Sequence, residues 1–126
     1  MTDFKERLEM FKEGGMIDDE DIESINNIID VFQNKYNVTL REENASTFIS
    51  HVCAAFYRFA NSEEVDQLPD EVFKEIESLD TYQDSLNIFN DVMQVVHKPF
   101  SDSERSYVLL HINNLISLLK SQGEWN

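Results

Sequence analysis

Apolar residues recur at three- and four-residue intervals along almost the whole chain, and very little interrupts them. The run Ile22, Ile25, Ile28, Ile29, Phe32 and Tyr36 is one example. This spacing places the side chains on one face of an α-helix. Only three Gly and two Pro occur in 126 residues, a scarcity that disfavours a turn-rich β fold. The sequence therefore predicts an all-α fold.

Turn and capping residues divide this pattern into five main helices and one short helix. Thr39-x-x-Glu42 and Ser101-x-x-Glu104 match capping boxes, so each is expected to open a helix. Another helix is expected to end near Lys98-Pro99, because the residue before a proline avoids the helical region. The six predicted helices carry apolar faces marked by Phe4, Leu8 and Phe11; by Ile22 to Tyr36; by Phe48, Val52, Ala55, Phe56 and Phe59; by Val72, Phe73 and Ile76; by Tyr82 to Val96; and by Val108 to Leu119.

The charge balance argues against some classes of partner. Twenty-five Asp plus Glu residues against ten Lys plus Arg residues give a formal net charge of −15. Binding to nucleic acid or to an anionic membrane needs clustered basic side chains, and here they are scattered singly. We therefore expect no direct nucleic-acid or membrane binding. The acidic field either attracts a partner with a basic docking face or only keeps the protein soluble.

Two features indicate a cytoplasmic protein. The first residues have neither the basic segment nor the apolar segment of a signal peptide, and no apolar run is long enough to span a bilayer. Cys53, the single cysteine, lies in an apolar helix and has no partner for an intramolecular disulfide. We expect Cys53 to be a small buried side chain in a reducing compartment.

Two of the three histidines lie at the edge of an apolar helical face. At about 100° per residue, His51 lies roughly 70° from the centre of its apolar face, and His111 roughly 90° from the centre of its own. Arg58 and Glu104 each lie seven residues from one of these histidines on the same side. An imidazole can change charge or accept a phosphoryl group near neutral pH. Alternatively, each histidine is an ordinary amphipathic residue at the rim of the core.

Other chemistries find no support in the sequence. It contains no Glu-x-x-His pair, no zinc-binding spacing, no glycine-rich phosphate loop and no Gly-x-Ser-x-Gly motif. Cys53 and His51 are two residues apart and point to different faces of a helix, which argues against a nucleophile pair. His97 is interpreted as a C-terminal cap residue of its helix. We expect no metal, no cofactor and no enzymatic activity.

The segment around the first histidine resembles a segment of the PTS regulation domain, or PRD, of bacterial sugar-responsive regulators. In the first PRD histidine segment, an apolar helix carries a His and then an Arg seven residues later. Residues 48–58 are similar, with His51 and Arg58 at those positions.

The segment around the second histidine, residues 99–112, is similar to the second PRD segment. That segment has an acidic helix start, a Glu seven residues before the His, an aromatic residue between them and a Leu-His-Ile sequence. Glu104, Tyr107 and His111 stand at the corresponding positions. The resemblance covers roughly residues 16–121.

The resemblance implies a compact PRD helical bundle. It also implies that His111 and His51 are phosphoacceptors for the phosphocarrier HPr or for a sugar-specific EIIB component, supported by Arg58 and Glu104. PRDs act as homodimers whose packing responds to the phosphoryl charge, so a homodimer is implied as well. The resemblance thus assigns a role in sugar-dependent transcription regulation.

Family members usually carry two PRDs beside an RNA-binding or DNA-binding module, and neither module is expected here. The chain resembles a stand-alone PRD, residues 16–126, preceded by an N-terminal helical extension, residues 1–15. Its output would then pass through a partner regulator protein. The competing hypothesis is an acidic helical interaction module in which the histidines are structural and no phosphate is involved.

Overall fold

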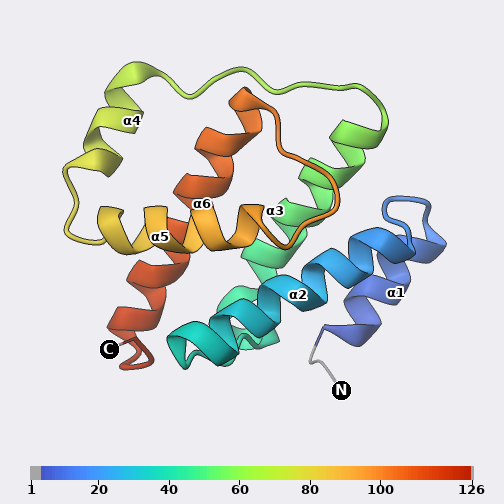
Figure 1. Cartoon of the computed structure of the whole chain (residues 1–126), viewed down its shortest axis with the longest axis horizontal. Helices are drawn as coiled ribbons and strands as arrows, with labels where there is room; N and C mark the ends of the chain where they lie inside the picture. The colour runs from blue at the N-terminus through green and yellow to red at the C-terminus, as the bar shows by residue number, and fades with distance from the viewer. Residues whose placement is uncertain (1–3, 126) are drawn as a thin grey trace.

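The computed structural model describes residues 4–125. Within that range the chain forms six α-helices and no strand, which confirms the predicted all-α fold. The helices are α1 (Lys5–Glu13), α2 (Asp19–Tyr36), α3 (Glu42–Ala60), α4 (Asp70–Glu77), α5 (Tyr82–Met93) and α6 (Asp102–Ser121). α6 packs against α3, α4 and α5, while α2 packs against α3 and α5 (Figure 1).

A single core of aromatic and branched side chains fills the space between these helices. Its largest fully buried members include Phe4, Phe32, Phe56, Ile25, Ile28, Ile49, Ile88, Ile112, Ile116 and Leu119. Burial of each such side chain stabilises the fold by about 1.5–3 kcal/mol. Phe59 was predicted to lie on the apolar face of α3, but it is 47% exposed, so this part of the prediction is wrong. It lies in the last turn of α3, opposite the point where α6 begins, so no further turn of α6 covers it.

The start of α3 differs from the predicted capping box. The helix begins at Glu42, and the Asn44 side chain accepts a hydrogen bond from the Arg41 backbone N–H at 2.8 Å. The Thr39 hydroxyl instead donates to the Gln33 side chain at the end of α2, at 2.5 Å. Asn44 also donates to the Thr39 carbonyl at 3.2 Å, which holds the short connection between α2 and α3 in place.

The start of α6 follows the prediction in one half only. The Ser101 hydroxyl accepts a hydrogen bond from the Glu104 backbone N–H at 3.3 Å and so acts as the N-cap. The Glu104 carboxylate does not return to Ser101, because it pairs with Arg58 on α3. The N-cap is thus confirmed, whereas the reciprocal half of the predicted capping box is wrong.

The end of α5 comes earlier than predicted, at Met93. Side chains of α2 replace the helical bonds beyond that point: Asn27 donates to the Val95 carbonyl at 3.1 Å, and the His97 backbone N–H donates to the Ser24 hydroxyl at 2.9 Å. His97 therefore lies in the loop before α6, and its Nε2 is 3.4 Å from a Glu23 carboxylate oxygen. The interpretation of His97 as a helix cap is wrong.

Both ends of the described chain are attached to the bundle. Phe4, the residue before α1, and Leu8 on α1 are buried in the common core, and the Arg7 guanidinium donates to Glu42 and to the Ser50 hydroxyl on α3. At the other end, Trp125 stacks on Tyr36 of α2 with a centroid distance of 6.0 Å. The extension that the sequence suggests over residues 1–15 thus contributes α1 to the same core.

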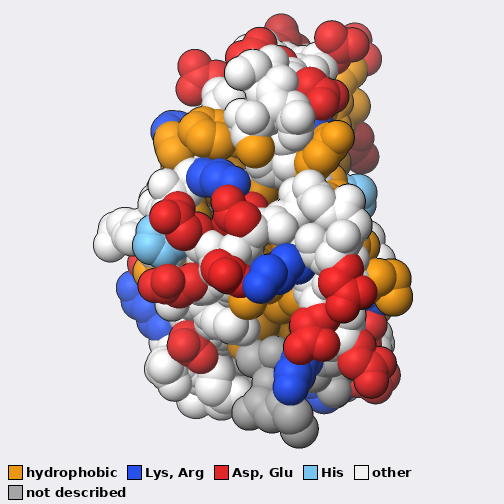
Figure 2. Space-filling model, turned by 90° about the vertical axis from the view of Figure 1, so that its right-hand side faces the viewer, with side chains coloured by type: hydrophobic (Ala, Val, Ile, Leu, Met, Phe, Trp, Pro, Cys, Tyr) orange, Lys and Arg blue, Asp and Glu red, His pale blue; other side chains and the backbone are white. Residues whose placement is uncertain are grey.

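Among the charged side chains, carboxylates outnumber basic groups. On the face seen in Figure 2, Asp and Glu side chains are spread widely, and Lys and Arg side chains lie singly between them. Within residues 4–125, none of the helices combines the length and the apolar character needed to cross a bilayer.

Candidate functional site

The site is built by the antiparallel packing of α3 and α6. Arg58 near the end of α3 pairs with Glu104 near the start of α6, and His51 in the middle of α3 meets His111 in the middle of α6. Residue numbers therefore rise along one helix as they fall along the other. In each helix the seven-residue spacing places the charged residue two turns from the histidine on the same face. Packing brings the two sequence segments together as one site.

The two imidazoles are stacked on one another. Their ring centroids are 3.7 Å apart and the ring planes differ by 10°. His51 is exposed and His111 is partly buried. Among the described residues, neither ring takes part in a side-chain hydrogen bond or an ion pair. The nitrogens of both rings therefore have no hydrogen-bond or ion-pair partner in this part of the chain; the His51 ring lies at the surface, and the His111 ring is partly covered.

Both rings favour the neutral form. Burial, together with the neighbouring His51 and Arg58, lowers the pKa of His111 to about 4. Burial and the positive charge of Arg58 also lower the pKa of His51. A neutral imidazole carries a lone pair on one nitrogen, which is the form that acts as a nucleophile.

Arg58 and Glu104 form a bidentate ion pair across the two helices. Arg58 Nε lies 2.6 Å from one carboxylate oxygen of Glu104, and a terminal guanidinium nitrogen lies 3.1 Å from the other. The Glu104 side chain is 5% exposed and that of Arg58 is 28% exposed. The hydrogen bonds to Glu104 raise the pKa of Arg58. Because a buried carboxylate needs a partner, this pair fixes α3 against α6 beside the histidines.

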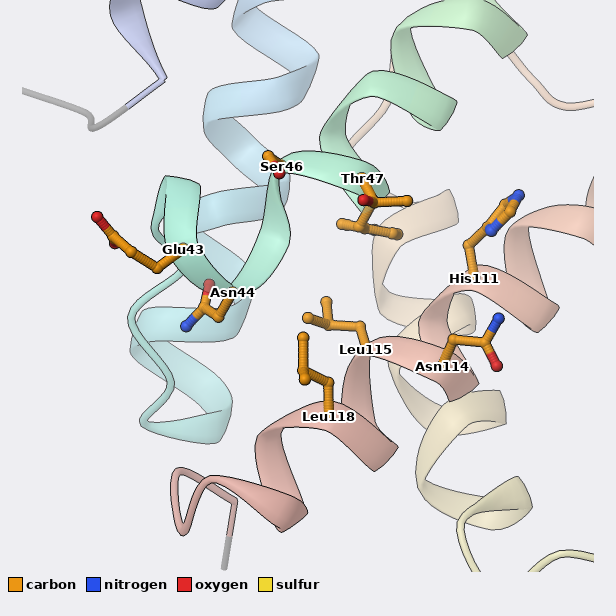
Figure 3. Close-up of a pocket in the computed structure, with 9 residues that line it drawn as sticks. Glu43, Asn44, Ser46, Thr47, His111, Asn114, Leu115 and Leu118 are labelled. Carbon is orange, nitrogen blue, oxygen red and sulfur yellow. The ribbon is translucent and has the colours of Figure 1, made fainter.

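Cavities lie on both sides of the histidine stack. One, of about 350 Å³, is lined by both imidazoles, the Arg58–Glu104 pair and Tyr107. The other, of about 250 Å³, begins at His111 and continues toward the start of α3 and the end of α6 (Figure 3). His111 lines both cavities, and we call the two together the histidine groove.

Sequence reasoning missed several polar residues of this groove, among them Thr47 and Asn114. Thr47 on α3 and Asn114 on α6 line the second cavity together with His111 (Figure 3). Thr47 stands four residues before His51 and Asn114 three residues after His111. These are the helical spacings that bring side chains to one face, so this signal was available in the sequence.

Cys53 and the possible metal ligands form no second site among the described residues. Cys53 is fully buried, and burial raises its thiol pKa to about 12, as expected for a structural cysteine. Among residues 4–125, no group of three or more His, Cys, Asp or Glu side chains is arranged to hold a metal ion.

Fold and groove together define a helical domain that presents a pair of neutral histidines at its surface. Residues 26–115, well over half of the chain, match the sequence model of the PRD domain. The chain belongs to the PRD family, and the matched range contains His51, Arg58, Glu104 and His111. PRD domains are regulatory rather than catalytic, and their role lies in the regulation of the sugar phosphotransferase system. Comparison with curated proteins and with solved structures found no match.

Proposed function

We propose that this protein is a cytoplasmic regulator of the bacterial sugar phosphotransferase system that is phosphorylated on His111 or His51. The donor would be the phosphocarrier HPr or an EIIB component. The observation that carries the proposal is the stacked pair of neutral, uncommitted imidazoles in an open groove. An ordinary rim histidine needs neither this pairing nor this access.

The chemistry is a transfer between imidazoles. A neutral ring nitrogen of His111 or His51 attacks the phosphorus of the donor's phosphohistidine. The donor's phosphohistidine ring carries a proton on its other nitrogen. The new N–P bond forms as the donor's N–P bond breaks, and the donor ring therefore leaves as neutral imidazole with the bonding electron pair. The acceptor keeps the proton on its other nitrogen, so atoms and charge balance without a further reactant.

The added charge supplies the signal. A phosphoryl group carries about −1.5 to −2 charges at neutral pH. It would enter beside Arg58, which already pairs with the buried Glu104. The guanidinium would then face two anions, and its bonds across the α3–α6 contact would be redistributed. That contact is the part of the molecule through which phosphorylation would alter packing.

This change in the packing of α3 against α6 would alter homodimerisation or the binding of a partner regulator protein. Exposed apolar side chains lie along the same two helices, namely Phe59 at 47% and Tyr57 at 40% on α3 and Leu118 at 40% on α6. Large exposed apolar side chains are frequent at protein interfaces. The acidic surface argues against direct binding to nucleic acid.

Phosphotransfer tests the proposal. The purified protein is incubated with the general phosphotransferase phosphorelay, and acid-labile, alkali-stable phosphate is measured. We expect labelling of the wild type and of a His97→Ala control, and its loss in a His51→Ala, His111→Ala double variant. Labelling that persists in the double variant overturns the site assignment. No labelling of the folded wild type favours the non-phosphorylated interaction module.

A further inference from the structure

The histidine groove contains two candidate phosphoacceptors but one cation. His51 and His111 lie with ring centroids 3.7 Å apart. Among the described residues that line the two cavities, Arg58 is the one Lys or Arg side chain, and it is already paired with Glu104. Two acceptors at this distance compete for the same space and the same counter-charge.

We infer that the His51–His111 stack holds at most one phosphoryl group at a time, so that phosphorylation of either ring blocks phosphorylation of the other. The inference rests on the proposed function and specifies how that site is regulated. It makes the pair a single binary site rather than two independent ones.

The first argument is electrostatic. Two phosphoryl groups carried by stacked rings repel one another even in water, and because each carries nearly −2, the product of their charges is about four times that of two unit charges. One guanidinium that is shared with Glu104 cannot neutralise both groups. We expect the equilibrium for adding a second phosphoryl group to be weakened by a factor on the order of one hundred or more.

The second argument is steric. Flat rings fit at 3.7 Å because this is the ordinary van der Waals separation of carbon atoms. A tetrahedral phosphoryl group is thicker than a ring, and its oxygens extend above and below the ring plane. A phosphoryl group on one imidazole therefore projects toward the plane of its stacked neighbour. Adding a second group would require the rings to separate.

The third argument concerns the position of the stack. Each ring is carried on a helix that packs along its length against the other, and the Arg58–Glu104 pair fixes that contact two turns away. Separation of the rings by side-chain rotation is limited on the His111 side, because His111 is partly buried between the two helices. The helices thus hold the two acceptors close together.

Stoichiometry tests the inference. The full-length wild type and the single variants His51→Ala and His111→Ala are phosphorylated to saturation by the phosphorelay, and intact mass is measured at alkaline pH. We expect one phosphoryl group on the wild type, one on each single variant and none on the double variant. Circular dichroism checks folding, and His51→Asn and His111→Asn replace any alanine variant that fails to fold.

Each other result overturns a distinct claim. Two phosphoryl groups on the wild type contradict mutual exclusion but leave the proposed function intact. A single variant that accepts none contradicts mutual exclusion as well, because the wild type would then have only one acceptor. No phosphoryl group on any folded form contradicts the proposed function itself.

Discussion

At the scale of single residues, the stacking of His111 against His51 changes what each ring does as pH varies. Burial and the nearby positive charges lower the pKa of His111 to about 4 and also lower that of His51. In an unfolded chain both rings titrate near 6.5. Below about pH 6.5 the unfolded state therefore binds more protons than the folded state. The free energy of unfolding falls as a result.

The first prediction concerns this pH dependence. The contribution of His111 to the free energy of unfolding is fully present above about pH 6.5 and is lost as pH falls toward about 4. The loss attributable to His111 is roughly 1–3 kcal/mol after allowance for its partial exposure. A His111→Asn variant should lose less stability than the wild type over this interval, as measured by urea unfolding at several pH values. Asn114→Ala, on the same helix, is the control. Parallel profiles for the wild type and His111→Asn would contradict the assignment.

The second prediction concerns the Arg58–Glu104 pair. Arg58→Ala leaves the buried Glu104 carboxylate without its partner and should cost about 3–5 kcal/mol of unfolding free energy. Glu104→Gln should cost roughly 1–3 kcal/mol. The double variant should cost clearly less than the sum, with a coupling of at least about 1 kcal/mol. The exposed Lys12–Asp19 pair, treated in the same way, should show a coupling below about 1 kcal/mol. Equal coupling energies for the two pairs would contradict a larger contribution of the buried Arg58–Glu104 pair.

At the scale of helices, the two capping motifs in the sequence are structurally unequal. Ser101 caps α6 through its hydroxyl, whereas Thr39 bonds back to α2 and leaves the start of α3 to Asn44. The sequence motif alone does not distinguish them. The difference arises because the connection between α2 and α3 is tight, with Val38 and Leu40 both buried.

The third prediction follows from that inequality. Ser101→Ala should lower the free energy of unfolding by about 0.5–2 kcal/mol because the first turn of α6 loses its cap. Thr39→Ala should change it by no more than about 0.5 kcal/mol, since it removes only an exposed side-chain bond. Urea unfolding followed by circular dichroism measures both values. The opposite ranking would mean that Thr39 is the more important cap.

Helical spacing was sufficient to predict six helices, and Ser101 marks a real boundary. The end of α5 was not predictable from local sequence. It is set by Ser24 and Asn27, which lie about seventy residues away and bond to the backbone of residues 95–97. A pattern that reports only local propensity carries no information on such bonds, and the position of His97 was wrong for this reason.

At the scale of the whole molecule, α1 lies outside the matched PRD range yet shares its core. Phe4 and Leu8 are buried with residues of the other helices, and Arg7 bonds to Glu42 and Ser50 of α3. Ser50 directly precedes His51 in the sequence. α1 thus supports the turn of α3 that carries the first histidine.

The fourth prediction tests whether α1 unfolds together with the bundle. Leu8→Ala should lower the global free energy of unfolding by roughly 2–4 kcal/mol, whereas Glu9→Ala, an exposed neighbour, should change it by less than about 0.5 kcal/mol. Trp125 stacks on Tyr36 of α2, and its fluorescence therefore reports on a part of the bundle outside α1. Far-ultraviolet circular dichroism and this fluorescence should report the same transition. An early loss of helix in Leu8→Ala with an unchanged Trp125 transition would make α1 a separate unit.

The sequence supplied candidate residues for the site, without Thr47 and Asn114, but not their geometry. The spacing of seven residues and the position at a helix edge identified His51, Arg58, Glu104 and His111. The stacking of the two rings depends on the register of α3 against α6, which is set by side chains along the entire contact. No local feature of either segment specifies that register.

Residue-resolved NMR of the histidine rings tests the central claim most directly, namely that the stacked imidazoles are the phosphoacceptors. The protein is labelled with ¹⁵N at histidine, and ring-nitrogen resonances are recorded before and after exposure to the phosphorelay. Phosphorylation of either stacked ring also changes the environment of its neighbour. We therefore expect the resonances of both His51 and His111 to shift and those of His97 to stay in place. Unchanged resonances of His51 and His111, or a change at His97 alone, would contradict the account.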